Sequence, residues 1–153
     1  MCKKRKGMDY TRMRCPYCGS PVALRSVGGI YKENNRGTML YVCARYPECD
    51  AYVRVQPGTN IPLGSLADRD LRALRNQAHR YFNQLYLSGL MTKENAYAWL
   101  SDQISAPRKE AHIGHLGEYY CKLVIDKSRE LLKMYAQRKK SAGIRIWKGG
   151  KAS

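Results

Sequence analysis

The stretch Cys15-Pro16-Tyr17-Cys18 is followed by 24 intervening residues and then by Cys43-Ala44-Arg45-Tyr46-Pro47-Glu48-Cys49. Two close cysteine pairs joined by a hairpin-length segment are typical of a tetrahedral zinc site, because each pair can hold the ion from one side. Gly19 follows the first pair, where a tight turn needs a residue that tolerates a positive φ. The pattern predicts one structural Zn²⁺ with Cys15, Cys18, Cys43 and Cys49 as ligands, and a redox pair or two disulfides are the alternatives.

The composition indicates a partner of opposite charge. The chain has 153 residues, with 28 Lys and Arg against 12 Asp and Glu, which give a formal net charge of +16. The charge is uneven, since residues 1–56 and 113–153 each carry +7 whereas residues 57–112 carry +2. Two basic ends favour a polyanion over a feature that serves solubility alone, with nucleic acid ahead of an acidic membrane surface or an acidic protein.

The sequence shows no sign of a membrane-spanning or secretory segment. No apolar run approaches the roughly 20 residues of a membrane span. The basic residues 1–10 are not followed by the apolar core of a signal peptide. Zinc-type cysteines without such a signal predict a cytoplasmic protein in a reducing compartment, with no membrane partner.

The N-terminal part predicts a small sheet tied to the metal. Residues 1–14 are expected to be a basic flexible arm, residues 15–56 a zinc ribbon and residues 57–64 a linker, because the last segment holds two prolines and two glycines. The ribbon contains short β-rich runs at residues 21–27, 38–42 and 51–55. These runs predict an antiparallel sheet with too little core to be stable without its metal.

Residues 65–138 predict a three-helix domain. Ser65 is expected to open the first helix, with Asp68 in capping-box position. Thr92 is expected to cap the second helix, and a third helix is expected to begin near residues 116–118 and to end at about Arg138. Residues 139–153 complete the chain as a basic tail. The fold class predicted is therefore α+β, a small antiparallel four-cysteine zinc ribbon followed by a three-helix unit.

The cysteine region resembles the zinc-ribbon modules repeated at the C-terminus of bacterial type IA topoisomerases. The shared features are a Cys-x-x-Cys-Gly motif at residues 15–19, an apolar strand at residues 40–42 and a Cys-Ala-x-Tyr-Pro-x-Cys block at residues 43–49. The resemblance covers about residues 13–55, here as a single copy with a longer spacer. It implies binding of single-stranded DNA, for which such modules use aromatic faces and basic side chains.

A longer stretch, residues 13–135, resembles a family of small zinc-finger-containing proteins of unknown function from bacteria and phages. After the ribbon, the motifs that carry this resemblance are Leu66-Ala67-Asp68-Arg69-Asp70-Leu71, Met91-Thr92-Lys93-Glu94-Asn95 and His112-Ile113-Gly114. The resemblance implies a phage or mobile-element origin, and hence the cytoplasm of a bacterial host, with no assigned activity.

Basic side chains interleaved with aromatic rings are the candidate nucleic-acid contacts. The cations would neutralise phosphates, while Tyr17, Tyr46 and Trp147 would stack on bases. Core packing is the alternative for the tyrosines, and docking on the protein's own core or on a partner is the alternative for Trp147. The candidate set is Lys3, Lys4, Arg5, Lys6, Arg14, Tyr17, Arg36, Arg45, Tyr46, Arg54, Arg138, Lys139, Lys140 and Trp147.

Two further groups of residues have both a structural and a functional interpretation. Arg72 and Arg75 share a helix face that could follow phosphates or could simply be solvated. His112, His115 and Cys121 could belong to a second metal site, although histidines that pack a loop and a core thiol at Cys121 are favoured.

The sequence predicts a non-catalytic zinc-ribbon protein that binds nucleic acid, with single-stranded DNA or RNA ahead of duplex. Four thiolates leave the zinc no open coordination position, so the metal is expected to hold the fold rather than to activate water. No paired-carboxylate motif, nucleophile elbow or P-loop indicates an enzyme. The alternative is a phage or mobile-element protein that inhibits or redirects a host nucleic-acid machine, such as a polymerase, a nuclease or a CRISPR effector, by binding its protein or ribonucleoprotein surface. The oligomeric state is left open by these patterns.

Overall fold

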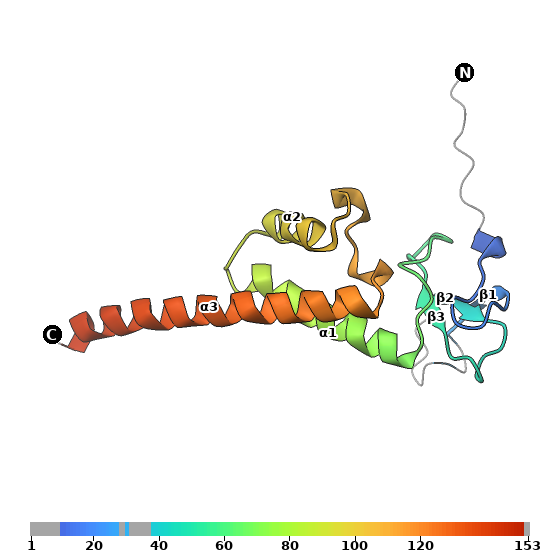
Figure 1. Cartoon of the computed structure of the whole chain (residues 1–153), viewed down its shortest axis with the longest axis horizontal. Helices are drawn as coiled ribbons and strands as arrows, with labels where there is room; N and C mark the ends of the chain where they lie inside the picture. Colours follow the sequence, from blue (N-terminus) through green and yellow to red (C-terminus); the bar gives the residue numbers. More distant parts are fainter. Residues whose placement is uncertain (1–9, 28–29, 31–37, 152–153) are drawn as a thin grey trace, which may run out of the picture. The chain divides into compact units, whose positions relative to one another are not determined.

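The structure is a computed structural model that describes residues 10–27, 30 and 38–151, with side chains described as far as residue 141. The chain divides into two compact units, Met1–Arg72 and Ala73–Ser153. Figure 1 shows the elements in chain order. They are η1 (Tyr10–Arg12), β1 (Val22–Ser26), β2 (Met39–Cys43), β3 (Tyr52–Arg54), α1 (Arg69–Leu87), α2 (Lys93–Ile104), η2 (Arg108–Glu110), η3 (Ile113–His115) and α3 (Glu118–Lys151). The predicted α+β fold is confirmed.

The N-terminal unit is built on a three-stranded antiparallel sheet in the order β1-β2-β3. Successive side chains of a strand point to opposite faces, so Tyr41 and Cys43 of β2 face one side while Leu40 and Val42 face the other. All four are buried. Tyr41 and Cys43 pack in a cluster with Val22 and the other three cysteines of the site, and Leu40 and Val42 pack with Val27 in a smaller cluster. The central strand therefore supplies the core on both faces.

The segment 57–64, predicted to be a linker, is hydrogen-bonded to the sheet. The Leu63 N–H donates to the carbonyl of Arg54 at 2.8 Å. The Tyr41 hydroxyl donates to the carbonyl of Asn60 at 2.6 Å. These bonds attach the segment to β2 and β3, so the prolines and glycines form a loop that belongs to the ribbon.

Helix α1 begins at Arg69, and the predicted start at Ser65 is wrong. The backbone groups of Ala67 and Tyr52 exchange two hydrogen bonds of 3.1 Å, which hold the chain extended beside β3 up to this point. The Asp68 Oδ1 then accepts the Leu71 N–H at 2.9 Å, so Asp68 supplies the cap that had been assigned to Ser65.

The C-terminal unit is a helical bundle with its own core. Phe82 of α1, which is 1 % exposed, meets the ring of Tyr97 on α2 edge-to-face at a centroid distance of 5.0 Å. The predicted cap of α2 is confirmed, because the Thr92 Oγ1 accepts the Asn95 N–H at 3.1 Å. The remaining buried side chains among the described residues of the three helices are Arg75, Ala78, Leu85, Ala96, Leu100, Ile104, Cys121, Val124, Ile125 and Ser128.

Helix α3 has a packed part and an unpacked part. Among its described side chains, which extend to residue 141, the last buried one is Ser128, and those from Ala136 to Ser141 are all exposed. The helix nevertheless continues to Lys151, through the segment predicted as a tail, for a total of 34 residues. At ~1.5 Å per residue this corresponds to about 51 Å of helix. Among the described residues, no helix combines the length and the apolar character needed to cross a membrane.

Replacement of Phe82 by Ala should destabilise the helical unit by about 3–5 kcal/mol, because it leaves a large cavity between α1 and α2. Urea unfolding followed by far-UV circular dichroism measures the loss. Leu87→Ala on the same helix is the matched control, since Leu87 is 67 % exposed. The control should change the free energy of unfolding by no more than about 0.5 kcal/mol. Equal effects of both substitutions would contradict the assigned core.

Candidate metal centre and nucleic-acid contacts

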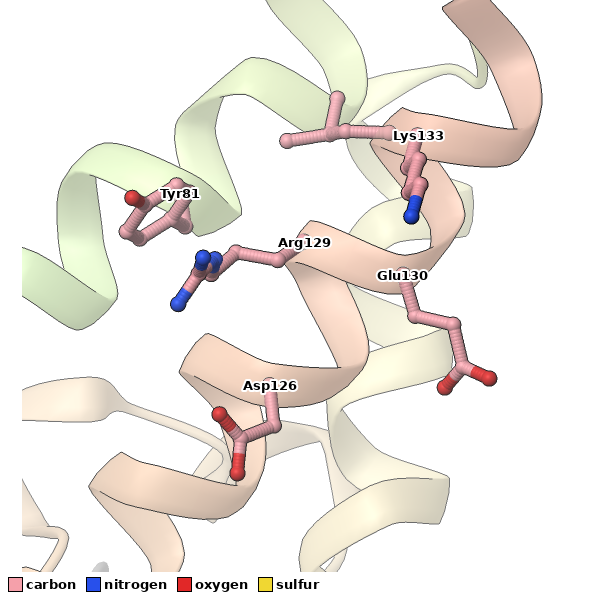
Figure 2. A pocket seen from close by; sticks show the side chains of 6 residues that line it. Tyr81, Asp126, Arg129, Glu130 and Lys133 are labelled. Atoms are coloured by element: carbon pink, nitrogen blue, oxygen red, sulfur yellow. The ribbon is translucent and has the colours of Figure 1, made fainter. Parts of the chain in front are cut away.

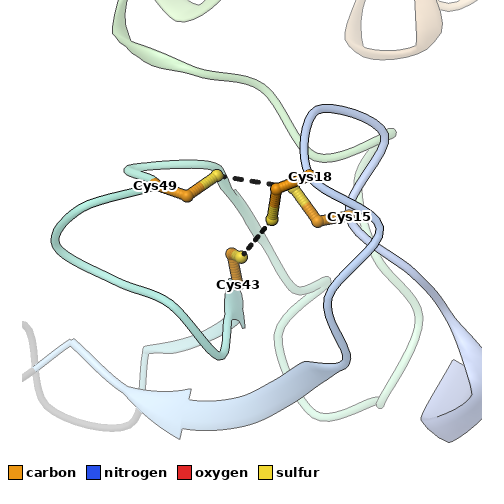
Figure 3. Close-up of side chains that lie close together, drawn as sticks. All are labelled: Cys15, Cys18, Cys43 and Cys49. Carbon is orange, nitrogen blue, oxygen red and sulfur yellow. Dashed lines mark hydrogen bonds between the residues drawn. The ribbon is translucent and has the colours of Figure 1, made fainter.

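The four predicted ligands converge in the N-terminal unit, as Figure 3 shows. Cys15 and Cys18 lie in the turn before β1, Cys43 ends β2, and Cys49 lies in the loop before β3. Their four Sγ atoms all lie within 4.8 Å of one another. The Sγ atoms of Cys15 and Cys49 are 3.6 Å apart, and those of Cys18 and Cys43 are 3.4 Å apart. Each contact joins one pair to the other, so the two pairs form a single cluster.

Tight backbone turns hold the cysteines of each pair in place. The Gly19 N–H donates to the carbonyl of Cys15 at 2.8 Å. Gly19 adopts a φ of +71°, which a residue with a Cβ atom rarely adopts. In the second pair the Cys49 N–H donates to the carbonyl of Arg45 at 3.1 Å. The chain therefore reverses direction at both pairs and turns two thiols inward from each.

The sulfur geometry fits a tetrahedral zinc ion. Sulfur atoms that lie about 2.3 Å from a zinc ion form a tetrahedron with edges of about 3.8 Å. The contacts of 3.4 and 3.6 Å and the 4.8 Å limit bracket that edge. All four cysteines are free thiols rather than disulfides. The cluster is thus a site for one structural Zn²⁺, in which Cys15, Cys18, Cys43 and Cys49 would fill every coordination position.

The surroundings of the thiols set their acidity before a metal binds. Hydrogen bonds from the side chain and the backbone of Ser20 lower the pKa of Cys18 to about 6. Burial raises the pKa of Cys43 to about 12. Zinc binding requires all four thiolates, so Cys43 must give up its proton when the metal enters. Zinc affinity is therefore expected to fall as the pH is lowered.

Arg72 braces the loop that carries the last ligand. Its Nη1 donates to the carbonyls of Asp50 and Ala67, each at 2.6 Å, and its Nη2 lies 3.1 Å from the Asp50 carboxylate. The guanidinium also stacks on the ring of Tyr52, with its central carbon 3.8 Å from the ring centroid. Asp50 directly follows Cys49, so the Arg72 brace fixes the backbone next to a zinc ligand.

Neither interpretation offered for Arg72 and Arg75 is correct. Arg75 is 7 % exposed, and its Nε donates to the carbonyl of Leu116 at 3.0 Å. Arg72 belongs to the brace of the ribbon. Both guanidinium groups therefore stabilise backbone carbonyls within their own units, and they do not form a phosphate-binding stripe. Helical spacing cannot reveal this role, because the carbonyls of Asp50 and Leu116 are remote in the sequence from the arginines that bind them.

The histidines do not complete a second metal site. Within the part of the chain that the structure describes, only the four-cysteine cluster brings three or more metal-ligand atoms together. Cys121 is fully buried, and its thiol donates to the carbonyl of Leu116 at 3.8 Å, which is the role of a core thiol. His112 and His115 are exposed beside each other, with ring centroids 6.1 Å apart.

The candidate contacts of the ribbon lie at its surface where they are described. Arg14, Tyr17, Arg45 and Arg54 are exposed and Tyr46 is half-buried. Lys3, Lys4, Arg5, Lys6 and Arg36 lie outside the described residues. The structure adds Arg25, which was not in the candidate set and whose guanidinium carbon lies 5.9 Å from the Tyr46 ring centroid. Arg25 shares a sheet face with Arg54, which the pairing register of the strands shows.

The candidate contacts of the C-terminal segment lie on α3. Arg138, Lys139 and Lys140 are exposed, and the Lys139 ammonium lies 5.9 Å from the ring centroid of Tyr135. Trp147 belongs to the helix, but its side chain is outside the described part. Whether these residues contact nucleic acid stays a prediction.

A hollow of about 490 Å³ between α1 and α3 carries both signs of charge, as Figure 2 shows. The guanidinium of Arg129 lies 5.7 Å from the ring centroid of Tyr81. Lys133 lines the same hollow together with the carboxylates of Asp126 and Glu130. These carboxylates oppose the cations, so the hollow does not favour a polyanion.

The fold and the cysteine cluster together define a zinc-ribbon protein. A family model described as a zinc-finger-containing domain matches residues 11–131. The chain therefore belongs to this family, as the sequence motifs predicted. The match begins before the first ligand and ends within α3, so it includes the helices as well as the ribbon. No curated protein and no solved structure matches the chain.

Replacement of Cys49 by Ser should abolish stoichiometric zinc binding and unfold the ribbon, because a three-thiolate site loses affinity and the small sheet depends on the metal. Elemental analysis of the purified protein measures the zinc content. Cys121→Ala removes a buried thiol outside the cluster and should retain one zinc per chain. Zinc loss from the control, or zinc retention by the Cys49 variant, would contradict the assigned ligands.

Replacement of Arg72 by Ala should weaken the ribbon by about 1–2 kcal/mol, because it removes charge-assisted hydrogen bonds at a partly exposed site. The expected readout is faster transfer of zinc to a colorimetric chelator. Arg69→Ala removes the same charge from an exposed position in the same helical turn and should leave the rate unchanged. If both variants release zinc equally fast, the brace does not act on the metal site.

Proposed function

We propose that this protein binds nucleic acid without catalysing a reaction, and that it prefers single-stranded DNA or RNA to duplex. The observation that carries the proposal is an arginine pair on one face of the ribbon sheet. Arg25 of β1 and Arg54 of β3 both pair with Leu40 of β2, so they project from the same side. Their backbones are two strand spacings apart, or about 10 Å. We call this surface the arginine face.

Accessible aromatic rings of the ribbon support the preference for unpaired bases. Tyr46 lies next to Arg25, and Tyr17 is 46 % exposed with its hydroxyl accepting the Asp68 N–H at 3.2 Å. A ring fixed at its hydroxyl end is a ready stacking surface. Stacking of a base on such a ring contributes about 1–3 kcal/mol in single-strand complexes. Paired bases in a duplex offer no free face for this contact.

The charge of α3 supports a polyanionic partner for the C-terminal unit as well. Residues 131–153 contain seven Lys and Arg and no Asp or Glu. Arg138, Lys139 and Lys140 among them are exposed. Such a segment attracts phosphates without reading sequence, because counterion release drives its binding.

The absence of catalysis and the cytoplasmic location are part of the same proposal. Four thiolates saturate a tetrahedral zinc ion, which would leave no position for an activated water. Free thiols as metal ligands suit a reducing compartment such as the cytoplasm, where disulfides seldom persist.

Binding of the zinc-loaded protein to labelled single-stranded DNA, single-stranded RNA and duplex DNA across a salt series tests the proposal. We expect micromolar or tighter binding to a single strand, with affinity falling steeply as salt rises. Weak binding of all three at physiological salt would overturn it. The charge would then serve a protein surface, in line with the alternative of a phage or mobile-element protein that acts on a host nucleic-acid machine.

The double substitution Arg25→Gln with Arg54→Gln should weaken single-strand binding and lower the magnitude of the salt slope by about 1.4, because two phosphate contacts are lost. Fluorescence anisotropy at several salt concentrations measures both effects. Arg69→Gln with Arg80→Gln removes the same charge from exposed positions of α1 and is the matched control. An equal decrease in the control would show that only net charge matters and that the arginine face is not the contact surface.

A further inference from the structure

A pocket of about 500 Å³ lies within the helical unit, where the end of α2, η2, η3 and the start of α3 meet. Ile104 and Leu116 line it and are buried, at 8 % and 6 % exposed. Tyr120 also lines it and is 38 % exposed. Buried apolar side chains together with an accessible aromatic ring suit a flat, weakly polar group such as a nucleobase.

The rim of this pocket is rich in nitrogen donors. Lys109, His112 and His115 line it and are exposed. The His112 Nε2 lies 3.0 Å from the carbonyl of Lys109. A carbonyl only accepts, so Nε2 carries the hydrogen in this contact. The Lys109 ammonium and the His115 imidazole are the rim groups that can present N–H groups to an anion. We call this site the histidine pocket.

The electrostatics around the histidine pocket favour an added negative charge. Partial desolvation, and then the positive charges of His112 and Arg75, lower the pKa of His115. Arg75 reaches this region from α1, where it bonds to the carbonyl of Leu116. An anion beside His115 would offset this repulsion among cations.

Two further features of the histidine pocket suit a nucleotide. The first intrahelical hydrogen bond at the start of α3 runs from the Cys121 N–H to the carbonyl of Gly117, which lines the pocket. The N–H groups that precede Cys121 in the first turn have no acceptor within the helix, and a helix start of this kind attracts anions. Among the described residues that line the pocket, Glu110 is the carboxylate. It repels a phosphate placed against it, but it can accept hydrogen bonds from sugar hydroxyls.

We propose that the histidine pocket binds a nucleoside 5′-monophosphate, with the base against Tyr120 and the phosphate between Lys109 and His115. The same chemistry is present in a free mononucleotide and in the 5′-phosphorylated end of a strand. Recognition of a strand end rests on the proposed nucleic-acid-binding function, whereas binding of the free nucleotide does not.

Nuclear magnetic resonance of the full zinc-loaded chain tests the pocket directly, with adenosine 5′-monophosphate as the probe. We expect saturable shifts of the ring resonances of His112 and His115, and no shift of these signals with adenosine, which lacks the phosphate. His79 lies outside the pocket and serves as the internal control. Equal shifts with adenosine and the monophosphate would show that the rim does not bind phosphate, and would overturn the proposal.

Oligonucleotides distinguish the two sources of the ligand. A single strand with a 5′-phosphate should bind about tenfold more tightly than the same strand with a 5′-hydroxyl, a difference of ~1.4 kcal/mol, if the pocket holds a strand end. Lys109→Gln with His115→Gln should remove this ratio. Lys127→Gln, at an exposed position of α3 outside the pocket, should preserve it. Circular dichroism of the variants verifies the fold, which exposed substitutions should not disturb.

The outcomes separate the failure of this proposal from the failure of the proposed function. Histidine shifts with the monophosphate, but equal binding of both strands, would assign the pocket to free nucleotides. Tight strand binding with neither a 5′-phosphate preference nor histidine shifts would reject nucleotide binding by the pocket and would support the nucleic-acid-binding function. Histidine shifts without strand binding would retain the pocket and reject the nucleic-acid function.

Discussion

The N-terminal unit depends on four thiolates meeting within one small volume. Its sheet has three short strands, and two of the zinc ligands, Cys15 and Cys43, are themselves buried core residues. A core of this size seldom stabilises a fold alone. Structural zinc contributes an apparent ~10–16 kcal/mol in zinc-finger peptides, which is comparable to the stability of a whole domain at about 5–15 kcal/mol. The metal is thus a central part of the core, and the Arg72 brace holds the backbone directly beside one of its ligands.

The features that sequence predicted correctly are local ones. The cysteine pairs, the position of Gly19 and the Thr92 cap each depend on residues only a few positions apart, where spacing alone fixes the geometry. The predicted start of α1 was wrong because the pairing of Ala67 with Tyr52 in β3 keeps the chain extended past Ser65, despite the capping signal there. The local sequence pattern does not indicate that tertiary pairing.

The arginines show the same limit for the candidate sites. Arg72 and Arg75 bond to carbonyls that are 22 and 41 residues away along the chain. A backbone carbonyl is present at every residue, so these two acceptors cannot be recognised in the sequence. Arg25 and Arg54 required the strand register before their common face was apparent. A basic residue in a basic sequence therefore has an ambiguous role until its acceptor is known.

The short distances between the sulfur atoms also make the cluster sensitive to oxidation. Thiols held at 3.4 and 3.6 Å are near neighbours for an oxidant as well as for a metal. Loss of two electrons from such a couple would join the sulfurs and remove two ligands from the ion at once. The ribbon would then lose the ion that holds its core, while the helical unit has no comparable cluster among its described residues. The time for which the N-terminal unit stays folded therefore depends on the reductants in its surroundings.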